Sequence, residues 1–414
     1  MMKRWLMIIF ALFLVTSYAP ANAAEQGQSA KPAFKDLPDN HWAYAYVMDA
    51  VQKGTVKGFP NGTFKPNDPV TVAEFLKMMF LSMAEKDENG KLYWAKAQQA
   101  LVPEWYNTIV YDGDVKFEQG SPWYINYVKS AKAMGVISQR EYEGRYDENL
   151  TRERAAWMIE EFDGYFNGPI SNSYAEVAGP QLFKDINKAL DTFTKYQIAG
   201  VAIRGIMIGN NGYFNPKATI TRAEAVKIVS LLPDASRRSK VSVNLKGVPY
   251  SAVTSPGYGE SIFVFKNAEM KKVYDTLRNN MSSYKGSVLE DHARLGYYEN
   301  DDKKEKGFHK TYFLDVSDTN RYVDMLVSFT SNNYSISLGL DPGYYERSSE
   351  TLGSMLGLIY KDSDSVKLLI SKAVVTARNG DAVDIRKTFN KRDILITSNG
   401  TKYLSISIGA YGDR

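Results

Sequence analysis

The sequence predicts a multidomain protein: an all-α amino-terminal half of helix-loop-helix repeats, followed by an α+β domain with a mostly antiparallel sheet. Three observations support this fold class. A block of sequence recurs three times before about residue 235. A polar stretch with proline at 232–240 is then typical of a linker. Beyond it, apolar and polar residues alternate, which favours strands.

The first 23 residues are typical of a secretory signal peptide. Lys3 and Arg4 precede an apolar run at 5–15, and the small residues at 21–23 suit a cleavage site. A membrane anchor is the alternative, but the run is shorter than the roughly 20 residues that span a bilayer. No later apolar stretch approaches that length. We therefore expect a secreted chain with no membrane span after signal cleavage.

Composition excludes several classes of site and partner. The chain contains no cysteine, so disulfides, thiolate metal sites and a lipid-modified cysteine are excluded. Its 51 Lys and Arg nearly balance 47 Asp and Glu, and this mixed charge does not favour a nucleic-acid partner. Retention at a surface would then require a specific binding site.

Each repeat carries three marks at nearly fixed spacing. An aromatic residue is followed 12 positions later by a glycine, and the glycine after 16 or 17 positions by a threonine. The three sets are Trp42, Gly54 and Thr71; Trp123, Gly135 and Thr151; and Phe193, Gly205 and Thr221. The expected repeats span residues 31–84, 105–165 and 180–234.

The spacing predicts helix, loop and helix in each repeat. A glycine such as Gly54 can take the left-handed conformation that ends a helix. The Thr-x-x-Glu sequences that begin at Thr71 and Thr221 predict capping boxes at the start of the second helix. In the second copy Arg154 replaces the glutamate, so no box is expected there.

These residues resemble the S-layer homology domain over roughly half of the chain. The matching segments are 34–38, 41–43, 58–67 and 71–74 in the first copy, 183–185, 209–216 and 220–224 in the third, and Trp123, 135–137 and 150–153 in the more diverged second. The resemblance implies a pseudo-threefold module whose grooves bind a secondary cell-wall polysaccharide, often through a pyruvylated sugar, or a peptidoglycan-linked glycan. It also implies a location at the surface of a Gram-positive-type bacterium.

The resemblance also nominates glycan-binding residues. Arg152 and Arg222 match the family's arginine, and a guanidinium suits a sugar carboxylate, although each could instead pair with a glutamate such as Glu153 or Glu224. The further candidates are Asp36, Asp185, Trp42, Trp123, Gly58 and Gly209. The tryptophans could alternatively be core residues, and the aspartates could cap a helix or fix a turn.

Departures from the family pattern predict unequal grooves. Val72 replaces the arginine of the first copy, so we expect at most two competent grooves. Phe193 replaces the third tryptophan, which we expect to weaken the third site separately. Extra residues at 85–104 and 163–181 lengthen the spacing between copies.

Residues 241–414 resemble no family that we recognise. We expect strands near 241–245, 323–329, 334–340, 383–385, 394–396 and 403–408, and helices near 270–281, 352–359 and 363–378. The charged stretch at 300–305 suggests an exposed loop, and 290–292 a solvated turn rather than a metal site. No nucleotide, hydrolase or zinc motif occurs, so no cofactor or metal is expected.

Three hypotheses for function follow from the sequence. We prefer an anchoring protein held by wall glycan, with a second domain of unknown binding or structural role. The alternative is a wall-anchored hydrolase, whose acidic pair could come from Asp315, Asp318, Asp324 and Asp341. A subunit of a surface lattice is the third. The polymer that is bound and the oligomeric state stay open.

Overall fold

The computed structural model describes residues 34–86, 92–94, 122–138, 140–256, 258–313, 322–330, 332–398 and 402–409. The expected signal peptide at 1–23, the start of the second expected repeat, Asp315 and Asp318 lie outside these ranges. Within them, no helix combines the length and the apolar character that crossing a membrane requires.

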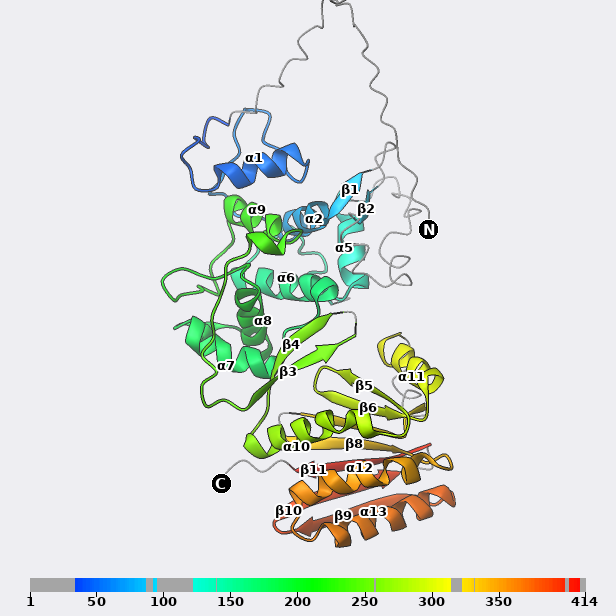
Figure 1. Cartoon of the computed structure of the whole chain (residues 1–414). Coiled ribbons are helices and arrows are strands. Elements are labelled where there is room, and N and C mark those ends of the chain that lie inside the picture. The colour runs from blue at the N-terminus through cyan, green and yellow to red at the C-terminus, as the bar shows by residue number, and fades with distance from the viewer. Residues whose placement is uncertain are drawn as a thin grey trace, which may run out of the picture.

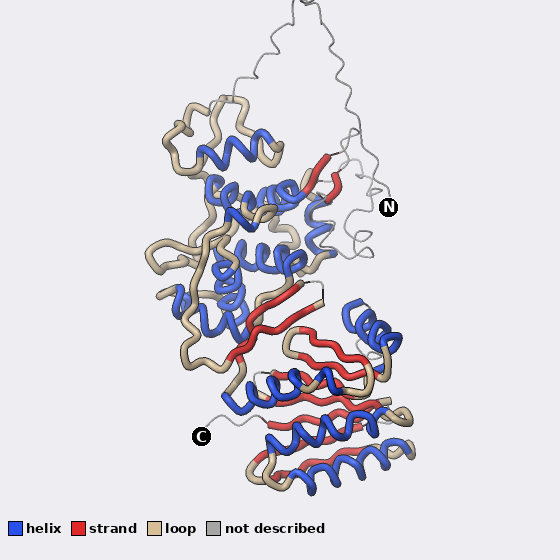
Figure 2. Tube along the Cα trace, in the orientation of Figure 1, coloured by secondary structure: helices blue, strands red, loops and turns tan. Residues whose placement is uncertain are grey.

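The chain folds around two hydrophobic cores, one in each half. The first core is formed by buried side chains between Leu37 and Leu232, and the second by those between Val253 and Ile408. Helices dominate the half with the first core, whereas the larger sheet and the helices packed against it form the other half (Figures 1 and 2). The expected fold class, an all-α module followed by an α+β domain with a mostly antiparallel sheet, is confirmed.

The described part of the first half contains two helices from each repeat and one extra helix. The described elements are α1 Tyr44–Gln52, α2 Val72–Met83, β1 Ala84–Lys86, β2 Leu92–Trp94, α5 Ile125–Ala133, α6 Arg152–Asn167, α7 Asn172–Leu182, η1 Ile186–Lys188, α8 Thr192–Ile203, α9 Arg222–Ser230 and η2 Ala235–Arg237. The pairs α1 and α2, α5 and α6, and α8 and α9 correspond to the three repeats. Helix α7 occupies the extra residues between the second and third copies.

Local signals in the sequence fix both ends of these helices. The capping boxes of α2 and α9 form as predicted, with the hydroxyls of Thr71 and Thr221 accepting from the amides of Glu74 and Glu224. Helix α6 begins after Thr151 without a side-chain cap, as its arginine predicted. The glycines that follow the first helices all have φ of +73°, the left-handed conformation that glycine adopts without strain.

These caps give the first testable prediction. We expect Thr71→Ala and Thr221→Ala each to lower the free energy of unfolding by about 1 kcal/mol, because each removes the acceptor of a helix amide. Thr151→Ala is the matched control, since the Thr151 hydroxyl is buried and has no hydrogen-bond partner within the described part of the chain. Urea unfolding followed by circular dichroism measures all three variants. Equal losses at the three threonines would contradict the prediction.

A cyclic set of backbone hydrogen bonds joins the three repeats. Val70 N donates to Ile220 O (3.0 Å), Ile220 N to Leu150 O (2.9 Å), and Leu150 N to Val70 O (2.9 Å). Each of these residues directly precedes the threonine at the start of a second helix. The three helix starts therefore meet around a pseudo-threefold axis, and the diverged second copy holds a place equivalent to the others.

The second half is built on a seven-stranded antiparallel sheet. Its described elements are β3 Tyr250–Ser255, β4 Gly259–Val264, α10 Ala268–Asn279, η3 Met281–Ser283, β5 Ser287–Asp291, β6 Arg294–Tyr298, α11 Asp301–Phe313, β7 Met325–Phe329, β8 Asn333–Gly339, α12 Tyr344–Ile359, α13 Ser363–Arg378, β9 Val383–Phe389, β10 Arg392–Ser398 and β11 Tyr403–Gly409. The strand order is β5-β6-β7-β8-β11-β10-β9, and β3 and β4 form a separate hairpin.

Alternating burial explains the two layers of this domain. Ile336 and Leu338 on β8, like Ile406 and Ile408 on β11, are fully buried, whereas the residues between them are only partly buried. The buried face belongs to the same core as side chains of α10, α12 and α13 (Figure 1). The helices near 270–281, 352–359 and 363–378 were therefore predicted correctly.

Several sequence predictions in this half are wrong. Residues 241–245 form no strand, because Asn244 bonds through its backbone to the Gln181 side chain instead of to a neighbouring strand. The expected loop at 300–305 is mostly the first turn of α11. There Asp301 and Asp302 accept from Lys304 (2.6 Å) and Lys306 (2.8 Å), and acidic residues stabilise a helix start.

Of the charged residues 290–292, which we expected in a solvated turn, only His292 lies in a turn. Glu290 and Asp291 end strand β5, and Asp291 is buried, accepting from the Ser255 hydroxyl at 2.6 Å. Arg278 Nε lies 3.0 Å from Glu290, and Arg294 also pairs with Asp291. One buried and one partly buried carboxylate require such partners, which sequence composition does not reveal. Among the described residues no group of three or more potential ligands could hold a metal ion.

The stretch 232–240, expected as a linker, does connect the two cores but is packed rather than free. Arg238 lies 2.6 Å from Asp163 and donates to the carbonyls of Leu231 and Leu232, both at 2.9 Å. Ser239 N donates to Gly205 O at 3.1 Å. Arg238, one of the basic residues that suggested exposure, instead neutralises a buried carboxylate.

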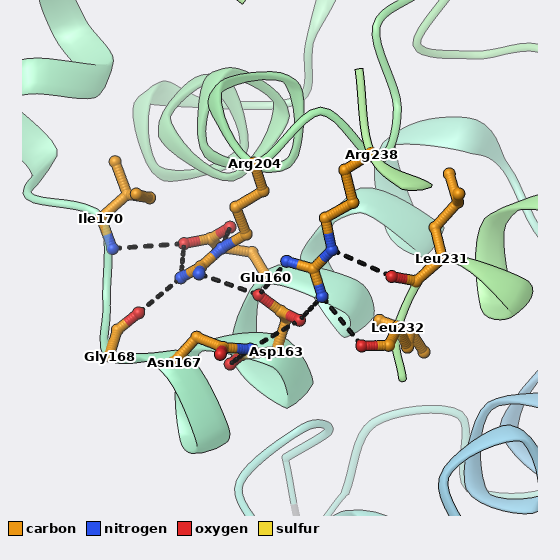
Figure 3. A network of polar contacts seen from close by, with 9 residues as sticks. All are labelled: Glu160, Asp163, Asn167, Gly168, Ile170, Arg204, Leu231, Leu232 and Arg238. Atoms are coloured by element: carbon orange, nitrogen blue, oxygen red, sulfur yellow. Dashed lines mark hydrogen bonds and ion pairs between the residues drawn. The ribbon is translucent and has the colours of Figure 1, made fainter. Parts of the chain in front are cut away.

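Asp163 belongs to a buried ionic network between α6, the end of α8 and the linker (Figure 3). Arg204 donates to both carboxylate oxygens of Glu160 (2.7 and 2.9 Å) and to Asp163 (2.9 Å). Burial raises the pKa of Glu160, and Arg204 acts against this rise. Two guanidinium groups thus compensate two carboxylates inside the first core.

Helix α7 adds a second connection between the halves. The Ser171 hydroxyl donates to Ile262 O at 2.6 Å, and the Ser173 hydroxyl accepts from Val264 N at 3.1 Å, both on strand β4. Since α7 arises from the extra residues between repeats, this insertion serves as a contact surface for the β3–β4 hairpin.

Candidate functional site

A groove of about 580 Å³ lies where the three repeats meet, and we call it groove A. Its lining includes Arg152 from the second repeat, the loop around 206–219 and α9 of the third, and Trp42 from the first. Four of the glycan-binding residues that the sequence predicted, Trp42, Arg152, Asp185 and Gly209, are thereby brought to one site. Groove A thus takes residues from all three copies.

Arg152 is held firmly at the wall of groove A. Its Nε donates to Phe214 O and its Nη1 to Glu224, both at 2.8 Å, while the guanidinium lies 5.2 Å from the Phe214 ring centre. Glu224 is one of the pairing partners that the sequence suggested. Because a guanidinium has five N–H donors, these two bonds leave it able to bind an anion.

Arg222 occupies the pseudo-equivalent place beside the first repeat, where it is only 7% exposed, and we call this place groove B. Its Nε donates to Phe64 O at 3.0 Å, and its Nη1 lies 3.7 Å from Glu74. The guanidinium also contacts the rings of Phe59 and Phe64. Burial lowers the pKa of Arg222, and Glu74 acts to raise it. The two arginines therefore make the same contacts with carbonyl, ring and carboxylate.

The aromatic marks of the repeats are exposed. The exposed fractions are 54% for Trp42, 51% for Trp123 and 57% for Phe193, so the interpretation of the tryptophans as core residues is wrong. Lys227 lies over the Trp42 ring and Lys77 over the Trp123 ring, at 6.0 and 5.1 Å. Helical spacing did not distinguish these rings from the buried residues beside them. An exposed ring next to a cation can stack on a sugar face.

A comparison with protein families supports the sequence resemblance. The family model described as "S-layer homology domain" matches residues 33–76 and 182–226, the first and third copies. The chain contains S-layer homology domains. The second copy holds an equivalent place in the cyclic hydrogen bonds that join the two matched copies.

Curated relatives match part of this chain. The chain is similar to an endoglucanase of Bacillus sp. (strain KSM-635), at 24% identity over 232 residues, which covers 55% of this chain and 21% of that protein. It is also similar to the S-layer protein EA1 of Bacillus anthracis, at 24% over 207 residues (49% and 20%), and to a cellulosome-anchoring protein of Acetivibrio thermocellus, at 34% over 80 residues (17% and 18%). The chain thus spans about a fifth of each relative.

Asp36 and Asp185 shape the loops of the S-layer homology domains. The carboxylate of Asp185 accepts from Phe214 N and Asn215 N, both at 2.8 Å, and that of Asp36 accepts in the same way from Phe64 N and Lys65 N. Partial burial acts to raise the pKa of Asp36, but these amide bonds lower it below its usual value. The aspartates therefore fix turns, one of the two roles that the sequence suggested, and orient the carbonyls that hold the arginines.

Gly58 and Gly209 allow close packing beneath the grooves. A Cβ at Gly58 would lie 2.1 Å from the Phe34 ring, and one at Gly209 would lie 2.7 Å from the Phe183 ring. Gly209 also has φ of +69°. Both glycines are thus required by packing, although Gly209 also lines groove A.

The third pseudo-equivalent place, beside Val72, carries both departures from the S-layer homology pattern, and we call it groove C. The Val72 amide donates to Glu148 O of the second repeat, at the place where Arg152 and Arg222 meet other loops. Phe193 stands where grooves A and B have Trp42 and Trp123, and it contacts Trp157 of α6. We expected Val72 and Phe193 to weaken different sites, but each groove combines three copies, and both fall in groove C.

Sequence reasoning missed the lysines of groove A. Lys188, Lys217 and Lys227 line it with Arg152. The sequence contained a signal for one of these lysines, because Lys77 and Lys227 each stand five residues after the position of the family arginine. The groove therefore combines several cations with an exposed tryptophan.

Asp324, an acidic candidate for the hydrolase hypothesis, is fully buried. Both its oxygens accept from Arg347, at 2.8 and 2.9 Å, and the Tyr284 hydroxyl donates to it at 2.5 Å. A carboxylate enclosed in this way holds β7 to α12 and does not meet a substrate.

Proposed function

We propose that the chain anchors itself non-covalently to the cell wall by binding an acidic secondary wall polysaccharide in grooves A and B. The single observation that carries this proposal is the composition of groove A. Arg152, three lysines and the exposed Trp42 surround one cavity. A sugar that bears a carboxylate, such as a pyruvate ketal, offers the anion for the arginine and the apolar face for the ring.

Groove B supports the same ligand. Arg222 repeats the carbonyl and carboxylate contacts of Arg152, and Lys77 repeats the position of Lys227 beside a tryptophan. Two equivalent sites on one chain can bind one repetitive polymer simultaneously, which raises the overall affinity without new contacts.

The surrounding features fit a protein of the cell surface. The proposed signal peptide would export the chain, and the S-layer homology domains would then hold it at the wall of a Gram-positive-type bacterium. Relatives named S-layer protein EA1 and cellulosome-anchoring protein support this location. We propose that the second domain has a binding or structural role at that surface.

A sedimentation assay tests the anchoring function. We expect the mature chain to sediment with purified native cell walls, and to stay in solution when the secondary polysaccharide has been extracted from those walls. The physical reason is that the cationic side chains of grooves A and B bind the negatively charged groups of the acidic polymer. Equal sedimentation with native and extracted walls would refute glycan binding.

A further inference from the structure

Groove C presents two aromatic rings where grooves A and B present a lysine and a tryptophan. Trp157 stands at the helix position of Lys77 and Lys227, five residues after Arg152. Its ring centre lies 6.3 Å from that of Phe193, which is 57% exposed. The cation of the other two grooves is therefore replaced by a second apolar surface.

A polar pair lies one helical turn beyond these rings. Gln197 Nε2 donates to Glu161 Oε1 at 2.6 Å, between α8 and α6. The equivalent positions hold Leu231 with Tyr46 beside groove A, and Leu81 with Tyr127 beside groove B. In groove C the Trp157 ring thus replaces the lysine, and one turn further an amide and a carboxylate replace a tyrosine and a leucine.

The charges of groove C are balanced. Val72 removes the arginine of the other grooves, and Arg154 lies where they have a glutamate. Arg154 Nη1 pairs with Glu141 at 3.0 Å, which neutralises it. Groove A, by contrast, is lined by Arg152 and three lysines against two carboxylates, Asp185 and Glu224. A sugar carboxylate would find no comparable excess of positive charge in groove C.

We propose that groove C binds an uncharged, N-acetylated sugar of the wall glycan. Its apolar face stacks on Trp157 and Phe193, and its hydroxyl and amide groups bond to Gln197 and Glu161. This inference rests on the proposed wall-binding function, and it assigns different sugars of the wall to different grooves. Grooves A and B hold the acidic sugars, and groove C holds a neutral one.

Calorimetric titration of the mature chain with two uncharged probes tests the inference. The probes are triacetylchitotriose and wall polysaccharide from which the pyruvate has been removed by mild acid. We expect at least one of them to bind, and Phe193→Ala to weaken that binding by about tenfold through loss of one stacking ring. Phe193→Trp should preserve or strengthen it. Since Phe193 is exposed, neither variant should disturb folding, which circular dichroism verifies.

The matched control separates this site from grooves A and B. Arg152→Lys with Arg222→Lys should leave binding of the neutral probe unchanged while weakening binding of the acidic polymer. The inference is wrong if neither probe binds, if Phe193→Ala has no effect, or if the arginine variant loses the neutral probe equally. If the acidic polymer no longer bound while the neutral probe still did, that result would bear on the proposed anchoring function of grooves A and B and not on groove C.

Discussion

Exchanging Arg152 and Arg222 together for lysine is expected to lower the affinity for acidic wall polysaccharide by about a hundredfold. Lysine keeps the positive charge but lacks the planar set of donors that can bind a carboxylate through two bonds. A charge-assisted hydrogen bond contributes about 1.5–3 kcal/mol, so each exchange should cost at least about tenfold. Each single variant should show the smaller loss, since the other groove still binds. Calorimetry with purified polymer measures all three.

A control for this experiment lies at the third pseudo-equivalent position. Val72→Ala changes a side chain at the same helix position but removes no charge, so acidic polymer should bind as before. Thermal unfolding shows whether the arginine variants remain folded, because both arginines also bond to loop carbonyls. If the folded double variant bound the acidic polymer as tightly as the natural chain, the arginines would serve the loops alone and the proposal would fail.

The sequence predicts features of the repeats that depend on a few neighbouring residues. The glycine after each first helix and the Thr-x-x-Glu boxes at Thr71 and Thr221 are local, and the structure confirms them. The missing cap at Thr151 follows from one substitution, Arg154, and was also foreseen. These features need no knowledge of the rest of the chain, which explains why they were predictable.

The composition of the grooves was less predictable because it depends on how three distant segments meet. Arg152 meets Phe214 and Glu224, more than sixty residues away, and shares a cavity with Trp42. The spacing of residues in the sequence does not indicate which of these distant residues meet. For the same reason Val72 and Phe193 were assigned to separate sites, although the structure unites them.

Burial was also difficult to infer from composition. Trp42 suggested a core residue and is half exposed, whereas Arg238 suggested a free linker and lies against a buried carboxylate. Helical periodicity indicates which residues share a face of a helix, but it does not indicate whether another element covers that face. In the second domain three of the four described helices and five of the nine described strands were predicted, whereas α11, β3 to β6 and the order of the strands required the structure.

Asp163→Asn is expected to lower the free energy of unfolding of the amino-terminal half by about 3–5 kcal/mol, the usual cost of breaking a buried ion pair. The carboxylate is fully buried between Arg204 and Arg238, so its loss leaves two guanidinium groups with only one buried carboxylate, Glu160. Urea unfolding of the mature chain measures the effect. The variant should also expose the linker, because Arg238 loses the partner that holds it.

Trypsin provides an independent test of that second effect, since it cleaves after Arg237 and Arg238. Asp49→Asn is the matched control, because Asp49 pairs with the neighbouring Arg237 at 3.5 Å but at the surface, where such a pair contributes at most about 1 kcal/mol. We expect rapid cleavage at the linker in Asp163→Asn and slow cleavage in Asp49→Asn and the natural chain. Equal resistance of all three would mean that Asp163 does not hold the linker, and that its packing depends instead on bonds such as Ser239 N to Gly205 O.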